Sequence, residues 1–600
     1  MRRKLMKNIK RLTAVILCLG LMLVTASCGK LKKATPEEVQ KSFDLFCDEL
    51  ITGMISGDPI SAHFLVTDPS DYGVEFKEED MTLGEISIDG IKSGVESNAS
   101  LLRHLKMYER DVLTDQQKIT YDTLCDYLEV QSAYKNAEML NCNFGPMSGI
   151  VSNLSTNFIE YVFYDKEDVD IYLTLLADVE RYMEQLFDVT REQAKKGYFL
   201  SDDNADLVIE QCEKILNAEV EPMEATFEDK MEKLDLSESE KAEYIKRNKE
   251  CVEKYYLPVY EKTIDLMEEL KGSRSNDGGL CAYGDEGRKF YEAIVKDNTS
   301  SDMTPEEVAE FLEDEASDLL KEAAAIAVSD YEAFESWIDY KPDFKTPDEV
   351  FEFLIDNIEK DFPKPETTQY NIEYQNKACE VEGVVAYYVL SRIDDINVNN
   401  VKVNGSAVSG NSLSLYTTLA HEGYPGHLYQ HTAFCKNDEI HDVRKALGFI
   451  GATEGWAQYA SYCTLDYLDI SDSTKRLIFI NDLLTYVVVS RVDIGVNYEG
   501  WDLDDTYKYL KNFFEVDRNY DEEGNSVKYF YNTVTGDPGS FIPYTVGYIK
   551  MLDMRERAEK ALGDRFDSVE YHKWIGDIGI TSFDVYEEQL ELWLAAKQEA

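Results

Sequence analysis

Positive charge is scarce in this sequence, in which 61 Lys and Arg residues stand against 116 Asp and Glu residues and give a formal net charge of -55. So acidic a surface repels nucleic acid and anionic lipid headgroups. We therefore expect no nucleic-acid partner for this chain. Beyond the N-terminal segment, no apolar run reaches the roughly 20 residues that a membrane-spanning helix needs.

Clustered cysteines are also lacking. The 11 cysteines are scattered along the chain and include no CxxC pair. This scatter is not the spacing of a zinc knuckle or of a disulfide framework. Any metal site in this protein must therefore be built from other side chains.

The N-terminal 28 residues have the pattern of a secretory signal rather than of a folded domain. A basic start precedes an apolar run over 12–24, and two small residues lead directly to Cys28. The ending Val-Thr-Ala-Ser-Cys resembles a bacterial lipoprotein box, whose cysteine becomes the lipid-modified first residue of the mature chain. We predict that residues 1–28 are a lipoprotein signal peptide and that Cys28 anchors the protein to the membrane at the bacterial cell surface. An ordinary cleaved signal or an uncleaved anchor helix is the alternative.

Helical periodicity dominates the rest of the chain. Apolar residues recur every three to four positions over 168–198, and similar patterns cover 205–234 and 237–270. The glycine-rich stretch 272–287 then interrupts the pattern and is typical of a loop. We expect residues 29–600 to form one mainly α-helical domain, with a division into two lobes at this loop as an open alternative.

Local signals agree with a mainly α fold that has few short strands. The segment Thr304-Pro305-Glu306-Glu307 combines a capping box with a proline at the first helical position, so it predicts the start of a helix. Strand signals are weak and short, as at Val401-Lys402-Val403.

Histidine gives the sharpest chemical signal. Only seven histidines occur in the chain, and four of them lie between positions 421 and 441. His421 and Glu422 follow an apolar helical segment, and His427 stands six positions after His421. The common HExxH zinc motif works because positions i and i+4 share one helix face. On a straight helix, position i+6 lies about 120° away, so two imidazoles at this spacing would not converge.

Pro425 and Gly426 lie between the two histidines and offer a remedy. Proline interrupts the helical hydrogen-bond ladder, and glycine tolerates unusual backbone angles. We predict a local bulge here that returns His427 to the face of His421. The two histidines are then candidate metal ligands, and Glu422 is a candidate general base that takes a proton from a metal-activated water.

A catalytic zinc site uses about three protein ligands, so a third is needed. Glu454 lies in a stretch of otherwise apolar and small residues, where a carboxylate is costly to bury unless it is paired or bound to metal. A partly exposed glutamate at a helix start is the alternative. Together with His421 and His427, we interpret Glu454 as the third ligand. His431 stands four positions after His427 and ranks below Glu454 as an alternative.

Two strings carry a family resemblance. TLAHEGYPGHLYQ, from Thr418, and TEGWAQYA, from Thr453, resemble the HExxPGH and EGWAxY motifs of the bacterial family called domain of unknown function 885. Residues 284–308, 485–501 and 538–558 resemble further segments of that family, so the likeness extends from about residue 40 to the C-terminus. The family is grouped with gluzincin-type metallopeptidases, whose two histidines and one glutamate bind zinc.

The resemblance implies a mainly α-helical body around a deep active-site cleft. It implies that His421, His427 and Glu454 bind zinc and that Glu422 is the catalytic base. Tyr544 falls on the tyrosine of the family's late motif, where a phenol would donate to a developing oxyanion. A buried core aromatic is an equally good interpretation of Tyr544.

Arg491 and Asn497 are the candidate substrate-binding residues. Arg491 would hold a substrate carboxylate, and an ion pair with a nearby acid such as Asp493 is the favoured structural alternative. Asn497 stands where the family pattern has a histidine, so it keeps hydrogen bonding but not titration. Leu428 and Ser461 are further departures from the family pattern, and none of the departures removes a predicted ligand or the base.

These features predict a zinc-dependent hydrolase, a metallopeptidase that cleaves short peptides at the cell surface. The expected cofactor is Zn²⁺, the expected partner is a peptide substrate, and the membrane is contacted through the lipid anchor only. Two alternatives stay open. One is a lipid-anchored binding protein with a structural or vestigial metal site, and the other is a non-peptide amidase or esterase that uses the same residues.

Overall fold

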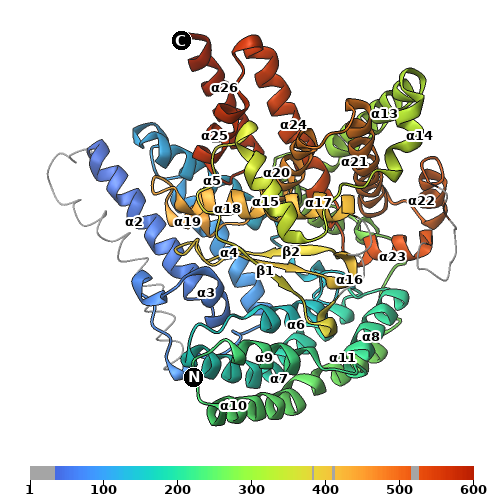
Figure 1. Cartoon of the computed structure of the whole chain (residues 1–600). Helices are drawn as coiled ribbons and strands as arrows, with labels where there is room; N and C mark the ends of the chain where they lie inside the picture. The colour runs from blue at the N-terminus through green and yellow to red at the C-terminus, as the bar shows by residue number, and fades with distance from the viewer. Residues whose placement is uncertain (1–33, 381–383, 409–411, 515, 517–525, 600) are drawn as a thin grey trace.

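The computed structural model describes residues 34–380, 384–408, 412–514, 516 and 526–599 (Figure 1). The signal segment and Cys28 lie outside these residues. The described chain is mainly α-helical with one small sheet, which confirms the predicted fold class. Among the described helices, none combines the length and the apolar character needed to cross a membrane.

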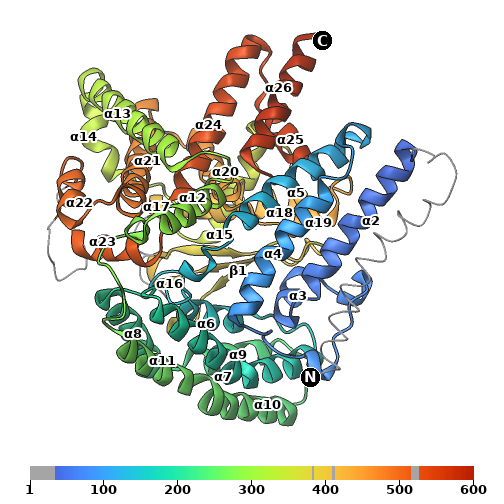
Figure 2. The ribbon, with the colours of Figure 1, turned by 180° about the vertical axis from the view of Figure 1, so that it is seen from behind.

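Two groups of helices form the first part of the described chain. The first group is α2 (Pro36–Ile55), α3 (Pro59–Leu65), α4 (Ile88–Leu105) and α5 (Asp115–Ala133). The second group is α6 (Ile150–Glu160), α7 (Lys166–Lys195), α8 (Asp202–Leu216), α9 (Pro222–Glu232), α10 (Glu238–Cys251) and α11 (Leu257–Leu270). Figures 1 and 2 show the second group at the bottom of the molecule, and its side chains form a hydrophobic cluster of their own.

Local sequence explains where these helices begin and end. α7 starts at a capping box in which the Asp165 side chain accepts the Asp168 N–H and the Asp168 side chain accepts the Asp165 N–H. The segment predicted as helix over 205–234 divides into α8 and α9, because Pro222 opens a new first turn. A π-helical turn over Val252–Tyr256 joins α10 to α11.

The second half of the chain carries the site. It consists of α12 (Asp285–Thr299), α13 (Pro305–Ser329), α14 (Tyr331–Ser336), α15 (Pro347–Asn357), β1 (Asn371–Tyr374), β2 (Ala386–Val389), β3 (Asn400–Val403), α16 (Gly405–Val408), α17 (Ser412–Glu422), α18 (His427–Lys436), α19 (Asp442–Lys445), α20 (Ile450–Cys463), α21 (Asp472–Ile494), α22 (Leu503–Leu510), α23 (Val527–Gly536), α24 (Ile542–Leu562), α25 (Ser568–Ile578) and α26 (Phe583–Glu599). The predicted helix start is confirmed, because Thr304 and Glu307 form a capping box at the beginning of α13. The larger hydrophobic cluster joins this half to the first group of helices.

The sheet has the order β1-β3-β2, with β1 parallel and β2 antiparallel to β3. The predicted strand at Val401-Lys402-Val403 is confirmed within β3, where the two valines are buried. β2 is an edge strand, and Tyr388 lies opposite Val401 in the register. β2 packs against α17, so the edge of the sheet lies beside the helix that ends in His421 and Glu422.

Glycines bring α20 and α24 into close contact. A Cβ on Gly547 of α24 would lie 1.8 Å from the carbonyl oxygen of Gly451 on α20, and a Cβ on Gly455 would lie 2.3 Å from the carbonyl carbon of Gly547. Only glycine permits backbones to approach this closely. Because Glu454 belongs to α20 and Tyr544 belongs to α24, this contact places the two side chains in one neighbourhood.

Candidate metal centre

The chain between the two predicted histidine ligands forms a break between two helices. α17 ends at Glu422 and α18 begins at His427. Gly426 donates its N–H to the carbonyl of Ala420 at 3.0 Å, and a Cβ on Gly426 would lie 1.7 Å from the His421 carbonyl oxygen. The bulge predicted within a single helix is therefore corrected to a sharp helix–helix turn, which glycine makes possible by its lack of a side chain.

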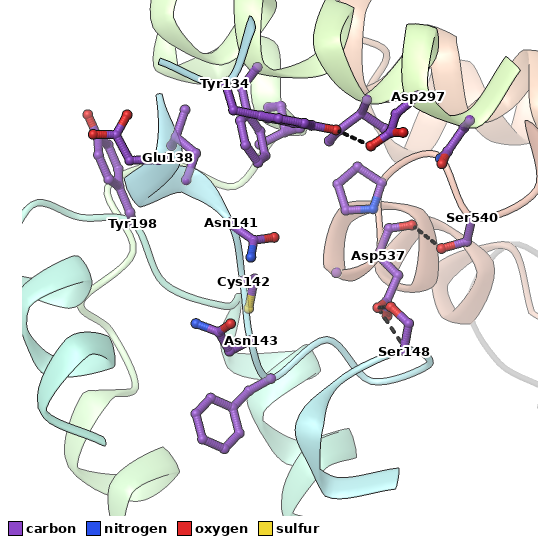
Figure 3. Close-up of a pocket in the computed structure, with 18 of the residues that line it drawn as sticks. Tyr134, Glu138, Asn141, Cys142, Asn143, Ser148, Tyr198, Asp297, Asp537 and Ser540 are labelled. Atoms are coloured by element: carbon purple, nitrogen blue, oxygen red, sulfur yellow. Dashed lines mark hydrogen bonds between the residues drawn. The ribbon is translucent and has the colours of Figure 1, made fainter. Parts of the chain in front are cut away.

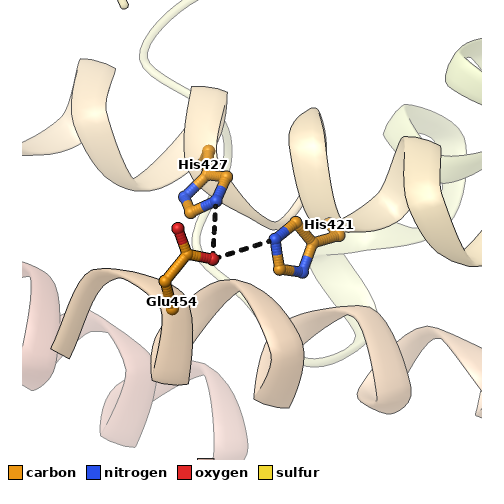
Figure 4. Close-up of side chains that lie close together, drawn as sticks. All are labelled: His421, His427 and Glu454. Carbon is orange, nitrogen blue, oxygen red and sulfur yellow. Dashed lines mark ion pairs between the residues drawn. The ribbon is translucent and has the colours of Figure 1, made fainter. Parts of the chain in front are cut away.

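This turn achieves the convergence that the motif requires. The rings of His421 and His427 lie with their centroids 4.6 Å apart and nearly perpendicular (Figure 4). Trp456 of α20 donates its indole N–H to the carbonyl of Pro425 at 3.0 Å. The turn is thereby tied to the same helix that carries Glu454.

Glu454 faces both imidazoles. Its Oε2 atom lies 3.3 Å from Nε2 of His421 and 3.5 Å from Nε2 of His427, as Figure 4 shows. The ligand atoms of the three residues all lie within 4.8 Å of one another. Burial opposes ionisation of Glu454, but the two imidazoles outweigh burial and hold its pKa at about 2. Glu454 is thus an ionised carboxylate at neutral pH.

The residues present fit a divalent metal ion. The Oε2 atom of Glu454 is buried and accepts no hydrogen bond from any described group. A buried, unsatisfied carboxylate oxygen is costly, and a cation would remove that cost. Two imidazole nitrogens and one carboxylate oxygen are a donor set that zinc uses in catalytic sites, where a further coordination position stays open.

Glu422 lies beside the three ligand residues without belonging to them. Its Oε1 atom is 3.9 Å from Nε2 of His421, and its Oε2 atom accepts the backbone N–H of Tyr388 at 2.9 Å. This N–H from the edge strand β2 fixes the direction of the carboxylate. One oxygen stays available for proton transfer, as a general base requires. Sequence reasoning missed the contribution of β2, because no motif marks the amide of Tyr388.

Two tyrosines stand near the carboxylates. Tyr544 on α24 is partly exposed, and its ring stacks on that of Tyr486 on α21 at 5.9 Å between centroids. Burial raises the pKa of Tyr544, and the charges of Glu454 and Glu422 raise it further. Burial, Asp482 and Glu454 likewise raise the pKa of Tyr486. Both phenols stay protonated, and neither hydroxyl is hydrogen-bonded to a described residue.

A cavity of about 790 Å³ extends from Tyr544 toward the first half of the chain. Ile450, one helical turn before Glu454 on α20, lines its wall together with Pro543. The opposite walls come from α4, α5, α7, α12 and the segment after α5 (Figure 3). The cavity therefore lies next to the candidate metal centre and is large enough for a ligand of several residues.

The structure places Arg491 in a structural ion-pair network. Its Nε atom is 2.9 Å from a carboxylate oxygen of Glu313, and its Nη2 atom is 2.9 Å from Glu499. The guanidinium also lies over the ring of Trp501, 4.6 Å from its centroid. The ion-pair interpretation holds, with Glu313 and Glu499 as partners instead of Asp493. The substrate-binding role predicted for Arg491 has no support from this geometry.

Asn497 is fully buried, and both polar atoms of its side chain form hydrogen bonds. Its Nδ2 atom donates to Asp493 at 3.2 Å and to the carbonyl of Val534 at 2.8 Å, while its Oδ1 atom accepts the N–H of Leu280 at 3.1 Å. Asp493 in turn accepts the N–H of Gly539 at 2.8 Å. Asn497 therefore holds together segments of the fold and is not exposed to a substrate, which corrects its predicted binding role.

His431, the alternative ligand, also points elsewhere. Its Nε2 atom lies 2.7 Å from the carbonyl oxygen of Ser391, to which it donates. Burial lowers the pKa of His431 to about 4, so the ring is neutral. The carbonyl of Ser391 engages Nε2 of His431, and His431 is absent from the group of three converging candidate ligands.

The whole of this site lies within a region of family similarity. Residues 68–590 match the family described as "Bacterial protein of unknown function (DUF885)". The chain belongs to this family. The comparison with curated proteins shows no match.

Two solved structures share the fold of this DUF885 chain. A predicted lipoprotein from Colwellia psychrerythraea is similar with a TM-score of 0.79 and 16% identity, covering 93% of this chain and 99% of that chain. A predicted lipoprotein of unknown function from Shewanella oneidensis is similar with a TM-score of 0.54 and 15% identity, covering 94% of this chain and 100% of that chain. At these identities the likeness shows a common fold.

Proposed function

We propose that this DUF885 protein is a zinc-dependent hydrolase, specifically a metallopeptidase that acts on short peptides. The convergence of His421, His427 and Glu454 on one point, with a buried carboxylate oxygen that accepts no hydrogen bond from a described group, is the observation that carries the proposal. Glu422 beside this point supplies the base that a hydrolase needs. A purely structural metal site would not need a partly free carboxylate at this position.

The chain's own residues account for the proton movements and the charge stabilisation of the reaction. A bound zinc ion would polarise the scissile carbonyl and lower the pKa of a water molecule. Glu422, oriented by the Tyr388 amide, takes the proton from the attacking water and later delivers it to the leaving amine. Tyr544, kept protonated by burial and by the neighbouring carboxylates, donates to the developing oxyanion.

The edge strand favours a peptide over other amides and esters. The N–H of Tyr388 points from β2 toward Glu422, and the carbonyl of the same residue points to the same side of a strand. No described strand pairs with this edge of β2. An extended peptide laid along the edge could donate a main-chain N–H to the Tyr388 carbonyl and would pass beside Glu422, which holds the Tyr388 N–H.

We also propose that the enzyme is anchored at the bacterial cell surface through Cys28. The basic, apolar and small-residue pattern of residues 1–28 supports this location. Both structural relatives are described as predicted lipoproteins, which agrees with it.

The substitution Glu422→Gln tests the catalytic part of the proposal. It removes the base while keeping the shape of the side chain, so we expect kcat/KM on a mixed peptide library to fall by about 10²–10⁴-fold with unchanged zinc content. Glu439→Gln, which changes an exposed residue three positions after the end of α18, is the matched control. Full activity in Glu422→Gln would contradict the proposed role. Turnover by the wild type of esters or small amides, but of no peptide, would contradict the peptidase assignment.

A further inference from the structure

The cavity beside Tyr544 has a far end that the proposed mechanism does not use. The short 3-10 turn Glu138–Leu140 and the segment 141–143 form part of its wall. Figure 3 shows Glu138 across the cavity from Asp537 and Ser540, which belong to the segment that leads into α24 and Tyr544. A ligand that fills the cavity would therefore extend from Tyr544 toward Glu138.

Glu138 has no charged or hydrogen-bonded partner among the described residues. Its Oε2 atom is buried and has no hydrogen-bond partner, and none of the described residues forms an ion pair with this carboxylate. A buried carboxylate oxygen without a hydrogen bond would gain from a cationic or donor group of a ligand. The side chains of Asn141 and Asn143 line the same end and form no hydrogen bond with described residues. Each amide is therefore free to donate to a carbonyl and to accept an N–H.

The other charged groups of the cavity are already engaged. The guanidinium of Arg274 donates to the carbonyls of Phe199, Asn276 and Gly278. The carboxylate of Asp537 accepts the N–H groups of Met147 and Ser148 and the Ser148 hydroxyl.

Asp297 accepts the hydroxyl of Tyr134 at 3.0 Å and an N–H of Gln131 at 3.4 Å. Of the charged side chains that line the cavity, Glu138 is therefore the one whose side chain forms no hydrogen bond with a described residue. The negative charge of Glu138 favours a cationic group on the ligand.

We propose that the cavity binds the amino-terminal part of a short peptide and that Glu138 receives its free α-ammonium group. Asn141 and Asn143 bind the peptide groups that follow. This inference rests on the proposed peptidase function and makes the protein an exopeptidase that acts from the amino end of its substrates. A substrate's terminal carboxylate is disfavoured in this cavity, because three carboxylates line it and would repel a further negative charge.

The test uses one peptide sequence in three forms: with both ends free, with an acetylated amino end, and with an amidated carboxyl end. Hydrogen bonds to charged groups are worth enough for a change of roughly 10–100-fold. We expect the wild type to lose that factor in kcat/KM on acetylation and to change less than about twofold on amidation. Glu138→Gln should lose the same factor on the free peptide, mainly through KM, and should treat the acetylated peptide as the wild type does.

Two further measurements separate peptide binding from turnover, and the effect of the Glu138 charge from that of the protein's net charge. In the Glu422→Gln background, the Kd of the free peptide should be lower than that of the acetylated peptide by a similar factor, because the cavity is intact. Glu243→Gln removes one charge from an exposed site on α10 and should match the wild type throughout.

The failures are distinguishable. Equal cleavage of the free and acetylated peptides by the wild type, or an unchanged profile in Glu138→Gln, would overturn the ammonium site and leave the peptidase function standing. A zinc-loaded wild type that cleaves none of the three forms and no library peptide would overturn both.

Discussion

Two histidine clusters of this protein are built from similar residues and differ in one respect. His572 on α25 donates from Nδ1 to the carbonyl of Asp361 and accepts at Nε2 from the hydroxyl of Tyr459, both at 2.6 Å. The Tyr459 oxygen accepts from Arg555 at 3.2 Å, and Phe362 stacks on the imidazole. Every polar atom of the His572 ring has a partner. In the candidate metal centre, the buried Oε2 atom of Glu454 faces two imidazoles but forms no hydrogen bond with a described group.

The difference shows how a ligand site can be recognised within a fold. Histidine, tyrosine and charged residues occur in both clusters, so the residue types do not separate them. What separates them is whether the protein itself satisfies the polar atoms that converge. By this criterion, Asn497 and His431 belong with His572, and Glu138 belongs with the metal centre.

The largest effect in the following comparisons is expected at Tyr544. Tyr544→Phe removes a donor to the developing oxyanion, and we expect kcat to fall by about 10²–10³-fold with little change in KM. Tyr548→Phe, one turn further along α24, is the matched control, because the hydroxyl of Tyr548 is buried and without a hydrogen-bond partner. Steady-state kinetics on a cleaved peptide decide the matter. Equal rates in the two variants would remove Tyr544 from the catalytic group.

A smaller effect, of a different kind, is expected at Asn497. Asn497→Ala abolishes three buried hydrogen bonds and leaves their partners unsatisfied, so the free energy of unfolding should fall by about 2–4 kcal/mol. Denaturant unfolding measures this loss. KM should stay within about twofold of the wild type, because the side chain does not reach the substrate. A raised KM with unchanged stability would restore the binding role that the family pattern first predicted for this position.

The smallest effect is the pH dependence of the free energy of unfolding that His572 causes. Burial lowers the pKa of His572 to about 3, whereas an unfolded histidine titrates near 6.5. The unfolded state therefore binds more protons below pH ~6.5, and the stabilising contribution of neutral His572 is lost as pH falls from that value toward 3. At pH 5 the loss is about 2 kcal/mol relative to neutral pH.

Unfolding free energies at pH 7.5 and pH 5 test this expectation. His572→Gln should show a shallower pH dependence than the wild type, even though its stability at pH 7.5 is lower. His104→Gln, which changes a partly exposed histidine, should keep the wild-type slope. The same slope in all three proteins would show that His572 is not held neutral by the fold.

The helical class and the proximity of His421 and His427 could be predicted from sequence, because both depend on local signals. Periodicity and capping boxes mark helices, and His421 and His427 lie on either side of a proline and a glycine. The remaining parts of the site depend on contacts between distant segments. The amide of Tyr388 comes from an edge strand 34 residues before Glu422. Glu138 comes from a turn that packs against the site only in the folded protein.

Arg491 and Asn497 also show that local sequence does not reveal contacts between distant segments. Their place in a family-like segment favoured a binding role, but burial and remote partners decide what each side chain does. Glu313 and Leu280 lie far from them in sequence, so no local pattern could indicate that they satisfy these two residues. The helix break at Pro425-Gly426 was predicted in position and not in form, because its form depends on the packing of Gly426 against the His421 carbonyl.

The most direct test of the account is the zinc content of the purified protein, measured by elemental analysis without chelators. We expect about one zinc ion per chain in the wild type and in His431→Gln, because Nε2 of His431 is already bonded to a carbonyl, and none in His427→Ala. The His431 variant matters because it removes a histidine from the same helix without touching the three ligands. A wild type without metal, or a His427→Ala protein that retains it, would contradict the central claim.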